Sequence, residues 1–131
     1  MKERLTAVSF GLWAESRALH LLQKQGWVLL HQRWYCRYGE IDLLLCKQSD
    51  DAARLLAVEV KGRRCCGPDC WGQAAFNSQK RRRLARALNC WLALNPDYGG
   101  CHLEVVLALV PMRPVDGAVR WLRVLNLDSS G

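Results

Sequence analysis

The sequence predicts a mixed α/β fold in the order helix, three strands, helix, two strands. Two long segments carry apolar residues at the spacing of amphipathic helices, and shorter apolar segments lie between turn residues. Short links join the first three strands, which predicts an antiparallel meander. The second helix then allows a crossover to a fourth strand parallel to its neighbour. We therefore expect a mixed sheet flanked by helices.

The first helix is expected over Ser9–Gln25, with Ser9 as its N-cap and Gly26 as its C-terminal stop. A short apolar run predicts the first strand over Trp27–Trp34. The second strand is expected over Glu40–Lys47. These three elements form the first half of the predicted order.

A turn signal at residues 49–51 separates the second strand from the third. The third strand is expected over Arg54–Gly62, which is rich in Val, Leu and Ala. Residues 63–72 contain Gly and Pro and are expected to form a loop. The second helix is expected over Gln73–Leu94, and it is ended by Asn95-Pro96.

Two strands complete the order. One is expected over His102–Val110, between a pair of glycines and Pro111, and an extra C-terminal strand is expected over Val119–Leu127. No stretch is typical of a linker, so residues 1–131 are expected to form one domain.

The composition restricts the classes of function. The formal net charge is +7, from 19 Lys and Arg against 12 Asp and Glu. A basic surface attracts polyanions such as nucleic acid, but many basic proteins bind none, and charge alone favours neither interpretation. No apolar run reaches the roughly 18 residues that span a bilayer, and residues 1–10 lack the apolar core of a secretory signal. We therefore expect a cytoplasmic protein with no membrane partner.

Seven cysteines are present, and an odd number without a signal peptide argues against a disulfide framework. Cys65, Cys66 and Cys70 form the only sequence cluster. Their spacing differs from the paired C-x-x-C of most zinc sites, so a loop with free thiols is favoured over a zinc site.

Charged residues occur inside two of the predicted strands. Since residues two apart share a face of a strand, Glu59 and Lys61 lie on one face of the third strand. If the second and third strands pair as a hairpin, Asp42 can lie beside both. Charges in otherwise apolar strands cost free energy unless they are paired or bind a metal ion. These three residues are therefore the candidate site.

Mg²⁺ and Mn²⁺ prefer oxygen ligands, which the carboxylates of Asp42 and Glu59 and the carbonyl of Val60 can supply. Lys61 can position a water and stabilise negative charge in a transition state. From the residues alone, the favoured alternative is a salt-bridge network among Asp42, Glu59 and Lys61.

Glu15 is a further candidate on the first helix. It shares a side of that helix with Leu19 and Leu22, so its carboxylate can face the sheet and reach the same cluster. The alternative is an exposed side chain that pairs with Arg17 or Arg4. Periodicity alone favours neither interpretation.

Three motifs resemble those of the YraN-like bacterial family of predicted endonucleases, within the restriction-endonuclease-like, or PD-(D/E)-x-K, superfamily. The segments GEIDLL at residues 39–44 and VEVKGR at residues 58–63 resemble the family's two strand motifs. The segment GLWAE at residues 11–15 is similar to its first-helix motif, with Ala14 in place of the usual glycine. The resemblance covers residues from about 11 to 110.

The resemblance implies a restriction-endonuclease-like α-β-β-β-α-β core. It also implies that Asp42 and Glu59 are metal ligands, that Lys61 is the catalytic lysine and that Glu15 is an accessory carboxylate. The implied activity is phosphodiester hydrolysis with Mg²⁺ or Mn²⁺. Glu104 lies in a segment, His102-Leu103-Glu104, where the family often has Arg-Phe-Asp.

Several polar residues near these motifs are candidates for contacts with nucleic acid. On the second helix, four consecutive basic residues cannot all share one face, and a solvated helix face is the favoured alternative for that helix. For Arg63, one step past the strand motif, the functional interpretation is favoured. Trp71 is the best candidate for stacking on a base. The nucleic-acid-binding candidates are Arg63, Gln73, Lys80, Arg82 and Arg83.

Three hypotheses about function follow. The leading one is a metal-dependent nuclease acting on DNA with branched or single-stranded structure. The second is a catalytically weak module that binds nucleic acid on a nuclease fold. The third is a thiol-rich interaction protein that binds zinc. A homodimer is expected by analogy with nucleases that cut two strands.

Overall fold

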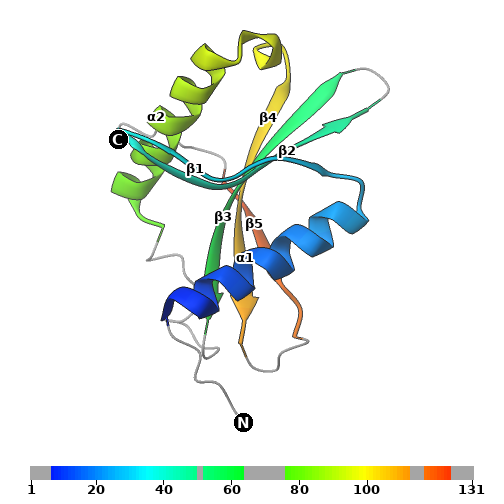
Figure 1. The fold of residues 1–131 in the computed structure, drawn as a ribbon, viewed down its shortest axis with the longest axis vertical. Helices are drawn as coiled ribbons and strands as arrows, with labels where there is room; N and C mark the ends of the chain where they lie inside the picture. Colours follow the sequence, from blue (N-terminus) through cyan, green and yellow to red (C-terminus); the bar gives the residue numbers. More distant parts are fainter. Residues whose placement is uncertain (1–6, 50–51, 64–75, 113–116, 125–131) are drawn as a thin grey trace.

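The computed structural model describes residues 7–49, 52–63, 76–112 and 117–124 (Figure 1). The observed order of elements confirms the predicted order, with one short 3₁₀ helix added. The elements are α1 (Ala7–Lys24), β1 (Val28–Cys36), β2 (Gly39–Gln48), β3 (Ala53–Arg63), α2 (Ser78–Leu94), η2 (Pro96–Tyr98), β4 (His102–Pro111) and β5 (Arg120–Arg123).

The five strands form one mixed sheet in the order β1-β2-β3-β4-β5. The pairs β1–β2 and β2–β3 are antiparallel, which confirms the meander. The pair β3–β4 is parallel, and β5 returns antiparallel to β4. Parallel neighbours need a crossover connection, and α2 lies in the link between β3 and β4.

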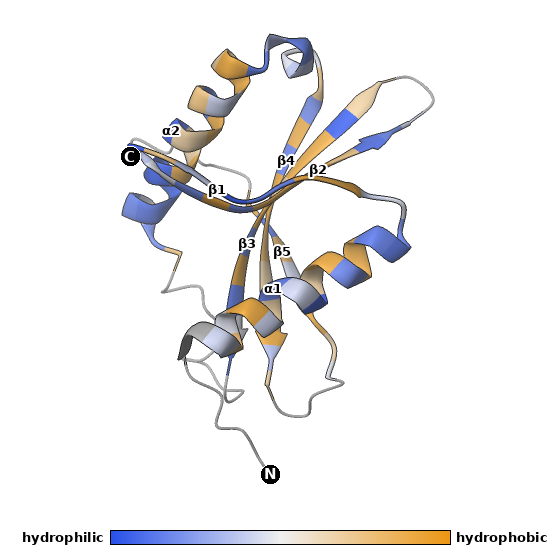
Figure 2. Cartoon of the chain, viewed as in Figure 1, coloured by the Kyte–Doolittle hydropathy of each residue, from blue (hydrophilic) through white to orange (hydrophobic). Residues whose placement is uncertain are grey.

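The core has two layers, one on each face of the sheet. Figure 2 shows hydrophobic residues along the central strands and hydrophilic residues at the start of α2. One cluster joins α2, through Leu84, Leu88 and Trp91, to the sheet. The other joins α1, through Ala14, Ala18 and Leu22, to the opposite face. Each helix therefore buries the apolar stripe that its sequence predicts.

The side-chain alternation of β2 changes near its start. Simple alternation places Ile41 on the same face as Leu43 and Leu45. In the structure Leu43 and Leu45 pack in the α1 cluster, whereas Ile41 packs in the α2 cluster. The strand therefore turns about its own axis at Asp42, which lies between the two sets.

Gly26 ends α1 as predicted. It adopts φ +94°, a conformation that favours glycine, and its N–H donates to the carbonyl of Gln23 at 3.1 Å. The N–H of Trp27 donates to the carbonyl of Leu22 at 3.2 Å, which completes a Schellman motif. The prediction of Ser9 as the N-cap is wrong, because α1 already begins at Ala7.

The second helix begins later than Gln73. Asn77 caps it, since its Oδ1 accepts a hydrogen bond from the backbone N–H of Lys80 at 3.0 Å. Phe76 and Asn77 therefore precede the helix, while residues 73–75 lie outside the described part of the chain. The predicted stop at Asn95-Pro96 is confirmed, because α2 ends at Leu94.

The predicted last strand is longer than the observed one. β5 has four residues, and Val119 and Val124, at its two sides, are not in the strand. Residues 125–127 of the prediction lie outside the described residues, as do Gln73, Trp71 and the Cys65, Cys66 and Cys70 cluster. Within the described ranges, no helix is long and apolar enough to cross a membrane.

Candidate active site

The antiparallel ladder between β2 and β3 ends within the sheet. Its pairing runs from Gln48–Ala53 to Leu43–Val58. Asp42, the next residue on β2, lies beyond the ladder, and its Oδ2 accepts a hydrogen bond from the backbone N–H of Val60 at 2.8 Å. A side-chain carboxylate thus takes the place of a strand-to-strand backbone bond, and the two strands diverge here.

A pocket of about 190 Å³ lies at this divergence. It brings together the three residues of the predicted site, Asp42, Glu59 and Lys61. Its remaining lining comes from the start of β2 and from the segment that leads into and along α2: Gly39, Glu40, Phe76, Lys80, Arg83 and Leu84. Two predicted nucleic-acid contacts, Lys80 and Arg83, therefore share the pocket with the carboxylates.

The two carboxylates repel each other when both are charged. Burial, and then the negative charge of Asp42, raises the pKa of Glu59 to about 8. Burial also raises the pKa of Asp42, although the N–H of Val60 acts in the opposite direction. At neutral pH, without a bound cation, the pair therefore retains a proton. A divalent cation can replace that proton and relieve the repulsion.

Basic groups also line the pocket. The ammonium of Lys61, followed by burial, lowers the pKa of Lys80, because two neighbouring positive charges destabilise each other. Arg83 adds a guanidinium to the same lining. With a proton on the carboxylate pair, the cations outnumber the anions, and the pocket attracts an anionic group such as a phosphate.

Glu15 faces the sheet, but it does not line the pocket. Its side chain is only 12% exposed, and Arg33 Nε lies 3.3 Å from its Oε1. Burial, and then the charge of Asp42, raises its pKa, so the two carboxylates interact electrostatically. The alternative of an exposed Glu15 is wrong, because its carboxylate is turned inward beside Arg33.

Arg33 gave no signal in the sequence. It adopts φ +52°, a left-handed conformation that costs about 1–2 kcal/mol for a residue with a side chain. The register of β1 against β2 also shifts between Leu29 and His31, two to four residues before it. Such strain persists where surrounding contacts stabilise it, and the ion pair with Glu15 is one such contact.

The described residues contain no group of three or more His, Cys, Asp or Glu side chains that could hold a metal ion. Glu15 therefore does not complete a three-carboxylate site with Asp42 and Glu59. Two carboxylates are still a common protein contribution to a Mg²⁺ site, because waters and substrate phosphate supply the other ligands. The donor set of the pocket fits an ion of this kind.

Gln73 lies outside the described residues, and the remaining predicted site residues do not line the pocket. The side chain of Val60 is buried on the α1 face. Arg63 is at the end of β3, and its Nε and Nη2 are buried without a hydrogen-bond partner among the described residues. Arg82 is exposed on α2 and does not line the pocket.

Gly39, Glu40, Phe76 and Leu84 line the pocket without having been predicted as site residues. Gly39 and Glu40 belong to the GEID motif, which was the available signal. A Cβ at Gly39 would lie 3.3 Å from both Cβ and the carbonyl O of Arg83. Glycine therefore lets β2 approach the backbone of α2 closely, and this approach brings Arg83 to the pocket.

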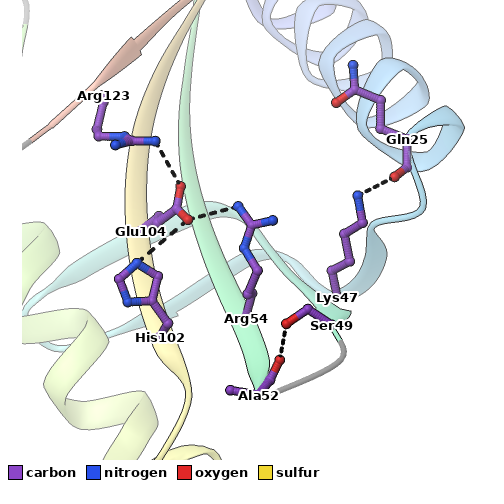
Figure 3. Close-up of polar contacts among 8 residues, drawn as sticks. All are labelled: Gln25, Lys47, Ser49, Ala52, Arg54, His102, Glu104 and Arg123. Carbon is purple, nitrogen blue, oxygen red and sulfur yellow. Dashed lines mark hydrogen bonds and ion pairs between the residues drawn. The ribbon is translucent and has the colours of Figure 1, made fainter.

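Glu104 lies away from the pocket, in a cluster of ion pairs (Figure 3). Arg54 donates to its Oε1 at 2.9 Å, and Arg123 Nη2 lies 3.7 Å from its Oε2. The hydrogen bond from Arg54 holds the pKa of Glu104 below its ordinary value. These contacts link β3, β4 and β5, which indicates a structural role for this segment.

Comparison with known proteins finds one family model, described as Uncharacterised protein family UPF0102, which matches residues 14–109. A UPF0102 protein of Prochlorococcus marinus strain MIT 9303 is 52% identical over 118 residues, which cover 90% of each chain. One from Synechococcus sp. strain CC9902 is 53% identical over 115 residues, or 88% of this chain and 92% of the relative. One from Cupriavidus metallidurans is 36% identical over 125 residues, which cover 92% of this chain and 86% of the relative.

Proposed function

Since this chain belongs to the uncharacterised protein family UPF0102, which is the YraN-like family, we propose that it is a metal-dependent nuclease that hydrolyses phosphodiester bonds. The proposed substrate is DNA with branched or single-stranded structure. One observation carries the proposal: Asp42, Glu59 and Lys61, from the family's two strand motifs, line one pocket at the divergence of β2 and β3.

Asp42 and Glu59 are the residues that would hold Mg²⁺ or Mn²⁺. Their raised pKa values support this assignment, because two crowded carboxylates gain from a cation between them. When bound, the ion would polarise a phosphoryl oxygen and lower the pKa of a bound water. The carbonyl of Val60 remains a candidate third ligand.

Lys61 would hold the attacking water and stabilise the negative charge that grows on the phosphoryl group in the transition state. Lys80 and Arg83 would bind phosphates of the same strand, because both line the pocket with Lys61. Glu15 would act indirectly, through its electrostatic interaction with Asp42.

A second candidate is a nucleic-acid-binding module that cuts poorly. One observation favours it: Glu15 turns to Arg33, and the described residues contain no group of three His, Cys, Asp or Glu side chains that could hold a metal ion. The basic residues in the pocket would serve either function. A homodimer, and zinc binding by the cysteine cluster, remain predictions.

The test is cleavage of labelled single-stranded, branched and duplex DNA with Mg²⁺ or Mn²⁺, compared with EDTA. Wild type should cut at least one substrate, and Asp42→Asn should cut at least about a hundredfold more slowly. Asp97→Asn, an exposed substitution on η2, is the matched control and should cut like wild type. Calorimetry with Mn²⁺ adds a second measurement: equal affinity in wild type and Asp42→Asn would contradict the site. Tight binding by wild type without cutting would support the binding module.

A further inference from the structure

A second pocket lies next to the candidate active site along α2. It is open, has a volume of about 470 Å³, and is lined by Tyr38, Arg86, Asn89 and Cys90. Tyr38 directly precedes Gly39, which lies against Arg83 in the first pocket. The two pockets therefore flank the place where the β1–β2 turn touches α2.

The spacing of the two pockets suits consecutive units of one strand of nucleic acid. Arg83 lines the first pocket and Arg86 the second, three residues along the same helix. Three residues advance an α-helix by about 4.5 Å. Successive nucleotides of a duplex strand advance by about 3.4 Å, and an unstacked strand can extend further. A phosphate near Arg83 thus leaves its neighbouring nucleotide within reach of the second pocket.

The lining of the second pocket has the chemistry of a nucleotide subsite. Tyr38 provides an aromatic ring on a residue that is 40% exposed, and the guanidinium of Arg37 lies over that ring, 5.2 Å from its centroid. Arg86 and Asn89 are exposed, and none of the described residues that line this pocket is acidic. An aromatic ring stacks on any base, an arginine pairs with a phosphate or stacks on a base, and an amide can both donate to and accept from a base edge.

We propose that this second pocket binds an unpaired base of the strand whose phosphate occupies the candidate active site, with Tyr38 as the stacking platform. The inference rests on the proposed function and extends it, because it assigns the preference for single-stranded substrate to named residues. A base within a duplex is stacked on both faces and is not available to a side-chain pocket. A single strand, or the unpaired part of a branched DNA, offers such a base.

The experiment measures binding by fluorescence anisotropy, in EDTA, of a labelled single-stranded oligonucleotide and of the corresponding duplex. Tyr38→Ala should weaken binding of the single strand about tenfold, the scale for one stacked base, and should change duplex binding much less. Tyr38→Phe keeps the ring and should bind like wild type. Tyr35→Ala is the matched control, because Tyr35 is 76% exposed and lines neither pocket. Circular dichroism confirms that each variant is folded.

A set of oligonucleotides with one abasic position each tests stacking directly. At one position, loss of the base should weaken binding by wild type about tenfold. The same loss should leave the affinity of Tyr38→Ala unchanged, because that variant already lacks the aromatic ring on which the base stacks. The proposal is wrong if Tyr38→Ala binds the single strand like wild type. It is also wrong if every abasic position weakens binding equally in Tyr38→Ala and in wild type. Failure of wild type to bind a single strand would likewise overturn it.

The outcome is independent of whether the protein cuts DNA. Coupling between Tyr38 and one base, without cleavage in Mg²⁺ or Mn²⁺, would remove the nuclease proposal and leave the nucleotide subsite. Cleavage without that coupling would remove the subsite and leave the nuclease.

Discussion

Asp42 accepts a hydrogen bond from the backbone of Val60 at the point where β2 leaves β3. A buried backbone N–H needs an acceptor, and here the acceptor is a carboxylate that also repels Glu59. The same bond therefore satisfies the backbone of β3 and holds the carboxylate of Asp42 in place. Such an arrangement lowers stability locally and favours binding of a cation.

The first residue-scale prediction concerns Lys61. Lys61→Ala should slow cleavage about a hundredfold or more, because a preorganised positive charge beside the phosphoryl group is lost. Binding should change much less, since one phosphate contact among several is removed. Single-turnover kinetics and thermal melts on the same samples measure both effects, and Lys24→Ala, exposed at the end of α1, is the control. A folded Lys61→Ala variant that cuts at the wild-type rate would exclude the residue from the mechanism.

The second residue-scale prediction concerns Glu59 and the dependence of the free energy of unfolding on pH. Its pKa rises from an ordinary 4.5 to about 8 on folding, so between these values the folded protein binds more protons than the unfolded chain. Without metal, this carboxyl lowers the free energy of unfolding as pH rises through that window, by up to about 1.4 kcal/mol per pH unit. Glu59→Gln should flatten that dependence, because the titrating group is gone.

Urea unfolding in EDTA at several pH values inside the window measures this slope. Asp97→Asn is the control and should retain the wild-type slope. Mn²⁺ should stabilise wild type and leave Glu59→Gln nearly unaffected, since a ligand that binds the folded state raises its stability. Equal slopes in wild type and Glu59→Gln would show that Glu59 does not carry the extra proton.

At the scale of elements, α2 determines which basic side chains reach the pocket. Its start at Ser78, capped by Asn77, sets the rotation of every later residue about the helix axis. Leu84 and Leu88 face the core, Lys80 and Arg83 line the pocket, and Arg82 points elsewhere. Of the four consecutive basic residues, two therefore line the pocket, Arg82 is exposed, and Arg81 donates to the carbonyl of Phe76 at 3.2 Å.

The α2 arrangement gives a paired prediction about salt. If nucleic acid binds at the pocket, Arg83→Ala should reduce the slope of log affinity against log salt by about one unit, because one phosphate contact is lost. The neighbouring substitution Arg82→Ala, which gives the same net charge as Arg83→Ala, should change the slope much less. Titrations of labelled DNA at a series of salt concentrations measure both slopes. Equal changes in the two variants would point to a diffuse basic surface instead of a defined contact.

At the scale of the whole molecule, the sheet is stabilised on its two faces by α1 and α2 and across its far strands by Glu104. The far strands, β4 and β5, complete the sheet beside the strand that carries Glu59 and Lys61. Their pairing keeps the end of β3 in place, so the site depends on contacts that do not touch it.

Glu104→Gln should therefore destabilise the fold by about 1 kcal/mol at neutral pH, a value that allows for the exposure of its partners. The partners hold its pKa below the ordinary 4.5, so its contribution is present above that pH and is lost as pH falls through the folded-state pKa. Urea unfolding of wild type and variant at neutral and acidic pH measures the difference. His102→Gln should cost less, because His102 lies 3.7 Å away and is largely exposed. An equal effect of Glu104→Gln at both pH values would rule out the charge as its cause.

The sequence by itself determined the order of the elements, the mixed sheet, the stop at Gly26 and the buried stripe of α2. The strand motifs also grouped Asp42, Glu59 and Lys61 in one candidate site, although the structure places Asp42 beyond the β2–β3 ladder, where the alternation of β2 changes. These features depend on local geometry, on the period of a helix or a strand and on the residues that end them. Local patterns are visible in any single sequence.

Only the tertiary structure decided the ion pair between Glu15 and Arg33, the choice of Arg83 over Arg82, and the pocket beside Tyr38. Each of these depends on how far β2 and β3 diverge and on how closely Gly39 approaches α2. Such contacts join segments far apart in the chain, and no local period encodes their distances. The start of α2 was missed for a related reason: the side chain of Asn77 competes for the backbone N–H of Lys80, and helix propensity alone does not show which residue becomes the cap.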